Sequence, residues 1–302
     1  MHKPLPLRDG VGASRVSLPA GQWPSVLAFL CDRFPAVEPQ EWLNRCEAGL
    51  VMYADGRPVS PLAPYQAQQH VFYYRDVPQE AKLPEDAQVL FEDEHLLVAD
   101  KPHFMPVTPG GNYLQSCLLV QLKRQTGCES LTPIHRIDRE TAGLVVYCKR
   151  AKDRNAYHAL FREHQVRKCY LAVAAFNPKL HLPLVHRSRL AEADKFFLSQ
   201  EVPGEPNSET RVSLLKRVGE EALYQLQPVS GHRHQLRVHM MSLGVPIDGD
   251  QFYPSVLRAR HEAEDFSQCL QLLAQRIAFT DPVSGEERDW QSRRSLKIIH
   301  TV

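Results

Sequence analysis

Residues 133–150 read PIHRIDRETAGLVVYCKR and join a charged loop to an apolar run. The run that begins at Gly143 is short and mostly apolar, which predicts a buried strand over 143–150. In the loop before it, Asp138 lies between Arg136 and Arg139. Nearby positive charge favours the ionised form of a carboxylate, so we expect Asp138 to act as a nucleophile or base rather than as an acid. The alternative is a loop salt bridge without a catalytic role.

The segments around this stretch predict strands with inserted helices. Residues 89–102 form two apolar runs around an Asp93-Glu94 turn. Helical spacing predicts helices over 151–165 and 232–246, and apolar patterning predicts a strand over 167–176 and two strands within 211–231. This order favours a mixed α/β (α+β) domain over a repeating parallel fold.

The N-terminal part predicts a separate, smaller unit. Residues 1–22 have no periodicity and are expected to form a tail, whereas 23–76 predict two short helices followed by a hairpin. Residues 77–88 are acidic and rich in proline, as in a linker. The main domain is then expected over 89–302.

The composition is that of a globular protein, with 43% hydrophobic and 24% charged residues among 302. No stretch is apolar enough for a membrane helix, and the N-terminus lacks the apolar segment of a signal peptide. The seven cysteines form no CxxC pair, and an odd number fits reduced thiols better than a disulfide framework. We therefore expect a cytoplasmic protein that does not engage a membrane.

The net charge of +1 hides an asymmetry along the chain. Residues 1–100 contain eight basic and fourteen acidic side chains, whereas 121–170 contain eleven basic and five acidic ones. A phosphate-binding surface is therefore expected on the C-terminal part. This expected surface includes the cluster Lys149, Arg150, Lys152 and Arg154.

A second group of polar residues lies in 230–253, SGHRHQLRVHMMSLGVPIDGDQFY. His234 and Arg237 are three residues apart and share one helical face, from which Arg237 could reach Asp138. His232, His234 and His239 are candidate metal ligands, but their spacing does not converge on one face. We therefore expect no metal.

Lys168 and Tyr170 form a third group. At strand periodicity their side chains lie on the same side, where Tyr170 could stack on a base or belong to the core.

These segments resemble, in order, the motifs of the RluA/RsuA-type pseudouridine synthases. HRIDRETAGLVVYCK resembles the family signature, and VLFEDEHLLVADKPHFMPVTPGG the entry strands with their "DKPxGxxVxP" stretch. RKCYLAVA, SGHRHQLRVHMMSLGVPIDGDQFY and QLLAQRIAFTDPVSGEE resemble the "KxYxA", "GRTHQIRxHxxxxGxPIxGDxxY" and "DPxTGE" segments. The resemblance covers roughly residues 88–288 and implies a fold with a central, mainly antiparallel sheet.

The resemblance also implies roles for individual residues. Asp138 matches the catalytic aspartate, Tyr170 the tyrosine that stacks on the target base, and Arg237 the arginine that pairs with the aspartate. Arg136 matches the arginine that fills the space of the flipped uridine. Four further side chains are expected to contact RNA: Arg139, Lys168, Arg233 and His234.

Three positions depart from the family pattern. His232 stands where arginine is common, Arg233 where a small polar residue is common, and His103-Phe104 where the second residue is usually glycine. Residues 23–76 also resemble the alpha-L type of RNA-binding domain, but their helices are acidic and neutral instead of basic. We expect this module to bind phosphate poorly.

The function implied is isomerisation of specific uridines to pseudouridine in ribosomal or transfer RNA, by a monomer that uses a catalytic aspartate, base flipping and no cofactor. Two other hypotheses are a non-catalytic RNA-binding or ribosome-assembly factor with the same fold, and a metal-dependent RNA hydrolase. The first requires a broken catalytic set, and the second requires converging metal ligands.

Overall fold

The computed structural model of the chain divides into two compact units, which are described separately. One comprises residues 1–80 with 111–115, and the other residues 81–110 with 116–302. The structure describes residues 5, 6, 8, 10–35, 37–75, 80–193, 195, 197–257 and 265–297. Residues 77–79 of the expected linker, and residue 76 before them, lie outside this part. Among the described residues, no helix combines the length and apolarity that a membrane crossing needs.

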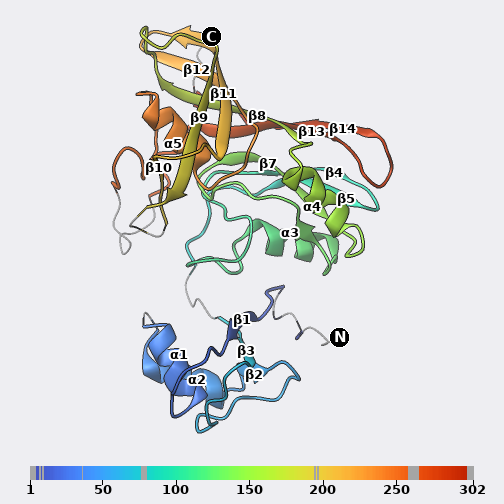
Figure 1. Cartoon of the computed structure of the whole chain (residues 1–302). Coiled ribbons are helices and arrows are strands. Elements are labelled where there is room, and N and C mark those ends of the chain that lie inside the picture. Colours follow the sequence, from blue (N-terminus) through green and yellow to red (C-terminus); the bar gives the residue numbers. More distant parts are fainter. Residues whose placement is uncertain are drawn as a thin grey trace. The chain divides into compact units, whose positions relative to one another are not determined.

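The smaller unit packs two helices with a three-stranded antiparallel sheet in the order β1-β3-β2 (Figure 1). Its elements are β1 (Ser14–Ser17), α1 (Val26–Arg33), α2 (Pro39–Glu47), β2 (Val51–Tyr53) and β3 (His70–Tyr73). Ser25 caps α1, because its hydroxyl accepts a hydrogen bond from the backbone N–H of Ala28 at 3.0 Å. Trp42 of α2 is buried among the apolar side chains of both helices and the sheet.

Strand β1 corrects the expectation that residues 1–22 form a tail. It pairs with β3 from Ser14 opposite Tyr73 to Ser17 opposite His70. The next residue, Leu18, is buried in the core of this unit, and its N–H donates to the carbonyl of Gln69 at 2.8 Å. A four-residue strand is too short to show an alternating pattern, so only its pairing partner reveals it.

The larger unit is built on one extended sheet with the strand order β10-β9-β11-β12-β8-β13-β7-β5-β4. In addition, β14 pairs with β13, and β6 pairs with β7. Among the described strands only the β13–β7 pair is parallel, so the expectation of a mixed fold with a mainly antiparallel sheet is confirmed. The strands are β4 (Gln88–Glu92), β5 (Leu96–Lys101), β6 (Thr132–Pro133), β7 (Ala142–Cys148), β8 (Arg167–Ala175), β9 (Leu184–Glu192), β10 (Ser199–Val202), β11 (Ser208–Val218), β12 (Glu221–Pro228), β13 (Leu272–Thr280) and β14 (Glu287–Gln291).

Three helices cover this sheet: α3 (Leu118–Thr126), α4 (Arg154–Arg162) and α5 (Gln235–Ser242) (Figure 1). Helix α3 packs on Val145 and Tyr147 of β7, whereas α4 packs on Leu144 and Val146 of the same strand. Because successive side chains of a strand point to opposite faces, α3 and α4 cover opposite faces of β7. This explains why β7 is buried throughout and apolar without alternation.

Gly143 makes the junction of β7 with β13 possible. Its φ of 111° lies in the region that favours glycine, and a Cβ added there would lie 2.3 Å from the carbonyl oxygen of Ala274. The close approach of the two backbones lies directly after the loop that carries Asp138.

Candidate active site

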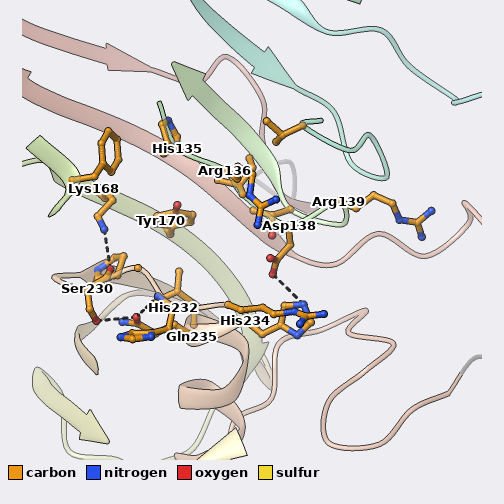
Figure 2. Close-up of a pocket in the computed structure, with 18 of the residues that line it drawn as sticks. His135, Arg136, Asp138, Arg139, Lys168, Tyr170, Ser230, His232, His234 and Gln235 are labelled. Carbon is orange, nitrogen blue, oxygen red and sulfur yellow. Dashed lines mark hydrogen bonds and ion pairs between the residues drawn. The ribbon is translucent and has the colours of Figure 1, made fainter. Parts of the chain in front are cut away.

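A pocket of about 1010 Å³ lies in the larger unit. Its walls come from residues 106–110, the loop before β7, the start of β8, and the segment from the end of β12 into α5 (Figure 2). Six lysine or arginine side chains line it, and Asp138 supplies the lining carboxylate: the cations are Arg136, Arg139, Arg162, Lys168, Arg233 and Arg237. A pocket of this size and charge suits a phosphorylated ligand of nucleotide size.

Asp138 is presented by a tight turn just before β7. The N–H of Thr141 donates to the carbonyl of Asp138 at 3.2 Å, and the carboxylate is about one quarter exposed, at 26%. At the start of the same loop, the His135 Nε2 accepts the N–H of Val146 at 3.1 Å, and the imidazole stacks on Phe161 of α4. Burial, followed by the charge of Lys168, lowers the pKa of His135 to about 3, so this imidazole stays neutral.

Arg237 reaches Asp138 as the sequence predicts, but its main partner is Asp250. The Arg237 Nη1 lies 3.4 Å from the Asp138 Oδ2, whereas Nε and Nη2 donate to the two oxygens of Asp250 at 2.8 and 2.6 Å. Burial opposes the charge of Arg237, but the contact with Asp250 outweighs this effect and raises the arginine pKa. The two hydrogen bonds to Asp250 thus fix the plane of the guanidinium, and Nη1 is left to contact the catalytic loop.

Glu140 is a second acidic partner in this network. Its side chain lies 3.7 Å from Arg237 and 3.0 Å from the Nε of Arg139. Burial would raise the pKa of Glu140, but the two arginines outweigh burial and lower it. Glu140 is therefore ionised beside Arg139 and Arg237.

Lys168 and Tyr170 of β8 both line the pocket, so the strand places them on one side as predicted (Figure 2). Burial, followed by the charge of Asp138, raises the pKa of Tyr170, so its hydroxyl stays protonated. The Lys168 Nζ donates to the carbonyl of Ser230 at 2.8 Å, and burial lowers its pKa to about 8. Lys168 is thus a cation that titrates near neutral pH.

Gln235 holds the segment before α5 in place, a role that the sequence analysis did not find. Its side-chain oxygen accepts from the Ser230 hydroxyl at 2.8 Å and from the His232 N–H at 3.1 Å. Its nitrogen donates to the Glu209 carbonyl and the Thr210 hydroxyl of β11, both at 3.0 Å. The position after His234 in the "THQ" segment is the signal that could have indicated it.

Phe104 keeps the backbone conformation of the glycine that it replaces. Its φ is 65°, in the left-handed region, and its side chain is buried against Phe266 with ring centroids 5.2 Å apart. The neighbouring His103 Nδ1 lies 2.7 Å from the carbonyl oxygen of Glu140. Phe104 thus adopts a left-handed conformation that glycine adopts without strain, and aromatic packing offsets the backbone strain.

Comparisons with known proteins agree with this site. A model of the RNA pseudouridylate synthase family matches residues 95–242, which include the Asp138 loop, β8 and α5. The chain is 32% identical over 235 residues to an uncharacterized RNA pseudouridine synthase of Synechocystis, covering 76% of this chain and 79% of that protein. The chain belongs to the RNA pseudouridine synthase family.

Two further comparisons extend this result. The synthase is 33% identical over 210 residues to the ribosomal large subunit pseudouridine synthase C of Pasteurella multocida, covering 67% of this chain and 62% of that one. The structure of human RNA pseudouridylate synthase domain containing 1 matches with a TM-score of 0.58 at 19% identity, over 72% of this chain and 86% of the human one. The likeness to the human structure shows a shared fold. As a member of the family, the enzyme is an isomerase that forms pseudouridine in RNA.

The expected catalytic and RNA-binding residues of the synthase fall into two groups. Eight of the residues proposed from the sequence line the pocket together: Arg136, Asp138, Arg139, Lys168, Tyr170, Arg233, His234 and Arg237. Arg162, His164 and His232 also line it, although the sequence analysis did not single them out for RNA contacts. Their positions at the end of α4 and before α5 become neighbours only through the fold.

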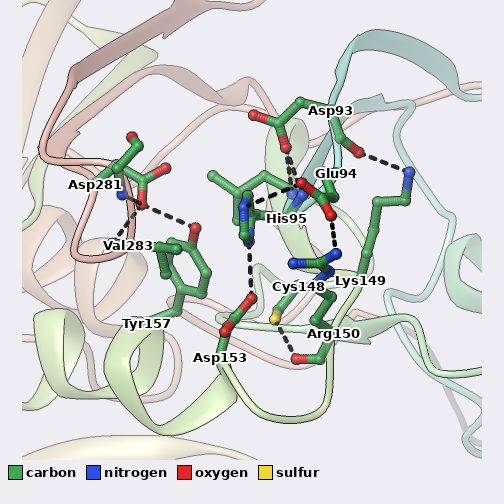
Figure 3. Close-up of polar contacts among 12 residues, drawn as sticks. Asp93, Glu94, His95, Cys148, Lys149, Arg150, Asp153, Tyr157, Asp281 and Val283 are labelled. Carbon is green, nitrogen blue, oxygen red and sulfur yellow. Dashed lines mark hydrogen bonds and ion pairs between the residues drawn. The ribbon is translucent and has the colours of Figure 1, made fainter.

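The other group, Lys149, Arg150, Lys152 and Arg154, does not line this pocket. Lys149 donates to Glu92 and to the carbonyl of Asp93, both at 2.7 Å, and Arg150 pairs with Glu94 (Figure 3). These contacts tie the turn after β7 to the β4–β5 turn. RNA binding by this group stays a prediction.

The candidate metal ligands of the synthase do not converge as a set. His232 bonds to the carbonyl of Asn207, and His234 faces Asp138. His239 instead lies near His186 and Glu201, with ligand atoms within 4.8 Å of one another. Both imidazoles already have hydrogen-bond partners there: Glu201 for His186, and Thr210, Ser188 and Ser208 for His239. This polar cluster under α5 is therefore satisfied by protein groups alone.

Proposed function

We propose that this chain isomerises specific uridines in ribosomal or transfer RNA, with Asp138 as the catalytic carboxylate. The observation that carries the proposal is the contact of Asp138 with the buried Arg237 inside a pocket lined by cations. A carboxylate in this setting is ionised and faces a space that attracts phosphate. The Pasteurella relative, named for the large ribosomal subunit, supports an RNA substrate of this kind.

The chemistry begins with a uridine that leaves the RNA stack, which costs a few kcal/mol. Arg136 is exposed at the pocket and is the side chain proposed to fill the vacated space, while Tyr170 stacks on the flipped base. The glycosidic bond to N1 is then cleaved, the base turns, and the sugar is rejoined through carbon 5. Asp138 acts on the sugar or the base during these steps.

The proposed reaction uses only protein groups, so we propose that it needs no metal or organic cofactor. Activity should persist after dialysis against EDTA, and a loss that zinc restores would support the metal-dependent alternative. We further propose a monomer that works in the cytoplasm. The seven free cysteines support a reducing compartment, and light scattering of the purified protein tests the oligomeric state.

The direct test uses ribosomal and transfer RNA transcripts carrying uridine tritiated at carbon 5, because the new bond at that carbon expels the tritium. The unaltered protein should release tritium from at least one transcript, and Asp138→Asn should release none. RNA affinity of the variant should stay within about threefold, since the change removes one negative charge and no cation. Binding without tritium release by the unaltered protein would favour the non-catalytic RNA-binding factor.

A further inference from the structure

His234 occupies a constrained position at the edge of the pocket. It is the N-cap of α5 with φ 55°, in the left-handed region, and its side chain is only 8% exposed. The imidazole lies nearly parallel to Phe252, with ring centroids 6.0 Å apart, and edge-on to Tyr253. A residue other than glycine is strained in this backbone conformation, and such strain clusters at functional sites.

The hydrogen bonds around Tyr253 assign the tautomer of His234. The Ser199 N–H donates to the Tyr253 hydroxyl at 2.8 Å, and this hydroxyl donates its single hydrogen to the Ser199 carbonyl at 3.1 Å. The His234 Nδ1 lies 2.9 Å from the hydroxyl oxygen of Tyr253. When the tyrosine hydrogen points to Ser199 in this way, the His234 Nδ1 carries a hydrogen and donates it to the tyrosine oxygen. The other ring nitrogen, Nε2, then carries a lone pair.

That lone pair faces the proposed catalytic carboxylate. The His234 Nε2 lies 3.9 Å from the Asp138 Oδ2, an interaction visible in Figure 2. Burial lowers the pKa of His234; Asp138 and, more weakly, Glu140 oppose this effect, whereas Arg237 and Arg233 reinforce it. Tyr253 faces the ring as a hydrogen-bond partner. At neutral pH the imidazole is therefore neutral and can accept a proton.

We propose that His234 takes from Asp138 the proton that the carboxylate removes from carbon 5 of the uracil ring, an inference that rests on the proposed function. Once the sugar is joined to carbon 5, the C5–H bond breaks, its electron pair returns to the ring, and its proton passes to Asp138. Asp138 hands this proton to the His234 Nε2, and the imidazolium releases it to water. N1, which has lost its bond to the sugar, gains a proton from water, so the reaction balances.

The transfer of the proton from Asp138 needs an acceptor that is neutral, and burial keeps the imidazole of His234 neutral where it faces Asp138. The 3.9 Å separation is bridged by one water or closed by a small shift of either side chain. His234 thereby returns Asp138 to its ionised form for the next turnover.

The test uses the full chain and the tritiated transcript from which the unaltered protein releases most tritium. In His234→Gln, kcat should fall at least about tenfold while KM changes by less than about twofold. The acid limb of the kcat profile against pH, which reports the coupled His234–Asp138 pair in the unaltered protein, should move to lower pH in the variant, because only the ionisation of Asp138 then limits kcat. His158→Gln, on the exposed side of α4 and outside the pocket, should behave like the unaltered protein.

A second variant separates chemistry from folding. His234→Ala leaves space for a free imidazole, so added imidazole should restore at least about a tenth of the lost kcat. A variant that is inactive because it is misfolded would not respond to imidazole in this way. An unchanged kcat with an intact acid limb in His234→Gln, or a loss confined to KM, would overturn the inference while leaving the proposed function in place. If no transcript loses tritium to the unaltered protein, the proposed function itself fails.

Discussion

At the scale of single residues, the site depends on how Arg237 is held. A guanidinium buried to 1% exposure is stable because Asp250, equally buried, accepts two of its hydrogen bonds. Asp138 and Glu140 share the remaining side of the cation at 3.4 and 3.7 Å. Asp250 therefore orients the arginine, and the arginine orients the catalytic loop.

Removing Asp250 should destabilise the larger unit strongly. In Asp250→Ala, Arg237 loses these two hydrogen bonds and stays buried, which costs about 3–5 kcal/mol of unfolding free energy. The matched control is Asp248→Ala in the same segment, whose partner Lys297 is half exposed at 48%. That change should cost less than about 1 kcal/mol. Urea unfolding of both variants checks the difference, and equal losses would contradict it.

Lys168 should make RNA binding depend on pH. Burial lowers its pKa to about 8, so the ammonium is present below that pH and its charge is lost as the pH rises through it. RNA affinity at low salt should therefore weaken between about pH 7 and pH 9. In Lys168→Arg the charge persists, so the affinity should stay flat over this range. A fall of the same size in both proteins, measured by fluorescence anisotropy, would exclude Lys168 as its source.

The sequence predicted the residues whose chemistry is local, and missed those that depend on the fold. Asp138 and Arg237 lie in dense charged motifs, and their contact is confirmed at 3.4 Å. Asp250 is also in a recognisable segment, but an aspartate beside a glycine does not indicate that its carboxylate is buried and accepts two hydrogen bonds from an arginine. Arg162 joins the pocket only because α4 ends beside it. No spacing along the chain carries that information.

At the scale of elements, apolar periodicity decided what could be predicted. The expected strands within 89–102, 167–176 and 211–231, and the helix within 151–165, correspond to β4, β5, β8, β11, β12 and α4. Strand β9 was not predicted because its inward side carries His186 and Ser188, which contact polar groups of β10, β11 and α5. Between Leu184 and Leu190 the inward side of the strand is polar, so the hydrophobic alternation is interrupted and does not reveal it.

The junction of β7 and β13 should tolerate no side chain at Gly143. An alanine there places Cβ 2.3 Å from the Ala274 carbonyl oxygen and keeps the unfavourable φ of 111°. We expect Gly143→Ala to cost about 3 kcal/mol or more. Gly219→Ala, also at positive φ but with open space around it, should cost only about 1 kcal/mol.

Thermal unfolding monitored by circular dichroism compares the two glycine variants. The melting temperature should fall further in Gly143→Ala than in Gly219→Ala. Tritium release should also be lost in Gly143→Ala, because the Asp138 loop moves with the displaced strand. A Gly143→Ala protein as stable as Gly219→Ala would mean that the two strands can separate without cost. The close backbone approach would then have no structural role.

At the scale of the whole molecule, the charge distribution assigns RNA binding to the larger unit. The N-terminal unit, residues 1–80 with 111–115, has seven basic and eight acidic side chains and therefore almost no net charge, whereas the pocket of the larger unit is lined by six cations. Each cation that neutralises a phosphate contributes about 0.7–0.9 to the slope of log affinity against log salt concentration. The N-terminal unit should therefore contribute little to this slope.

Three variants test whether the larger unit provides most of the RNA contacts, and the measured quantity is the slope of log affinity against log salt concentration. Neutralising Arg136, Arg162 and Arg233 to glutamine should flatten the slope by about two units. Neutralising Lys149, Arg150, Lys152 and Arg154 should flatten it less, since Lys149 and Arg150 are paired with acidic side chains. Deleting residues 1–75 should change it least.

This deletion retains Glu80, which accepts the N–H groups of Leu114 and Gln115, both at 2.8 Å. Circular dichroism must confirm that the shortened chain folds. If the deletion flattens the slope more than the pocket substitutions do, the N-terminal unit binds RNA directly.

The central claim, that Asp138 in this pocket forms pseudouridine in ribosomal or transfer RNA, is tested most directly in cells. Pseudouridines are mapped by carbodiimide sequencing in the parent strain, in a strain lacking the gene, and in this strain after return of the gene in the unaltered or the Asp138→Asn form. One or more uridines should lose their modification in the deletion strain, regain it with the unaltered gene and stay unmodified with Asp138→Asn. Full modification restored by Asp138→Asn, or a pseudouridine map identical in all four strains, would contradict the claim.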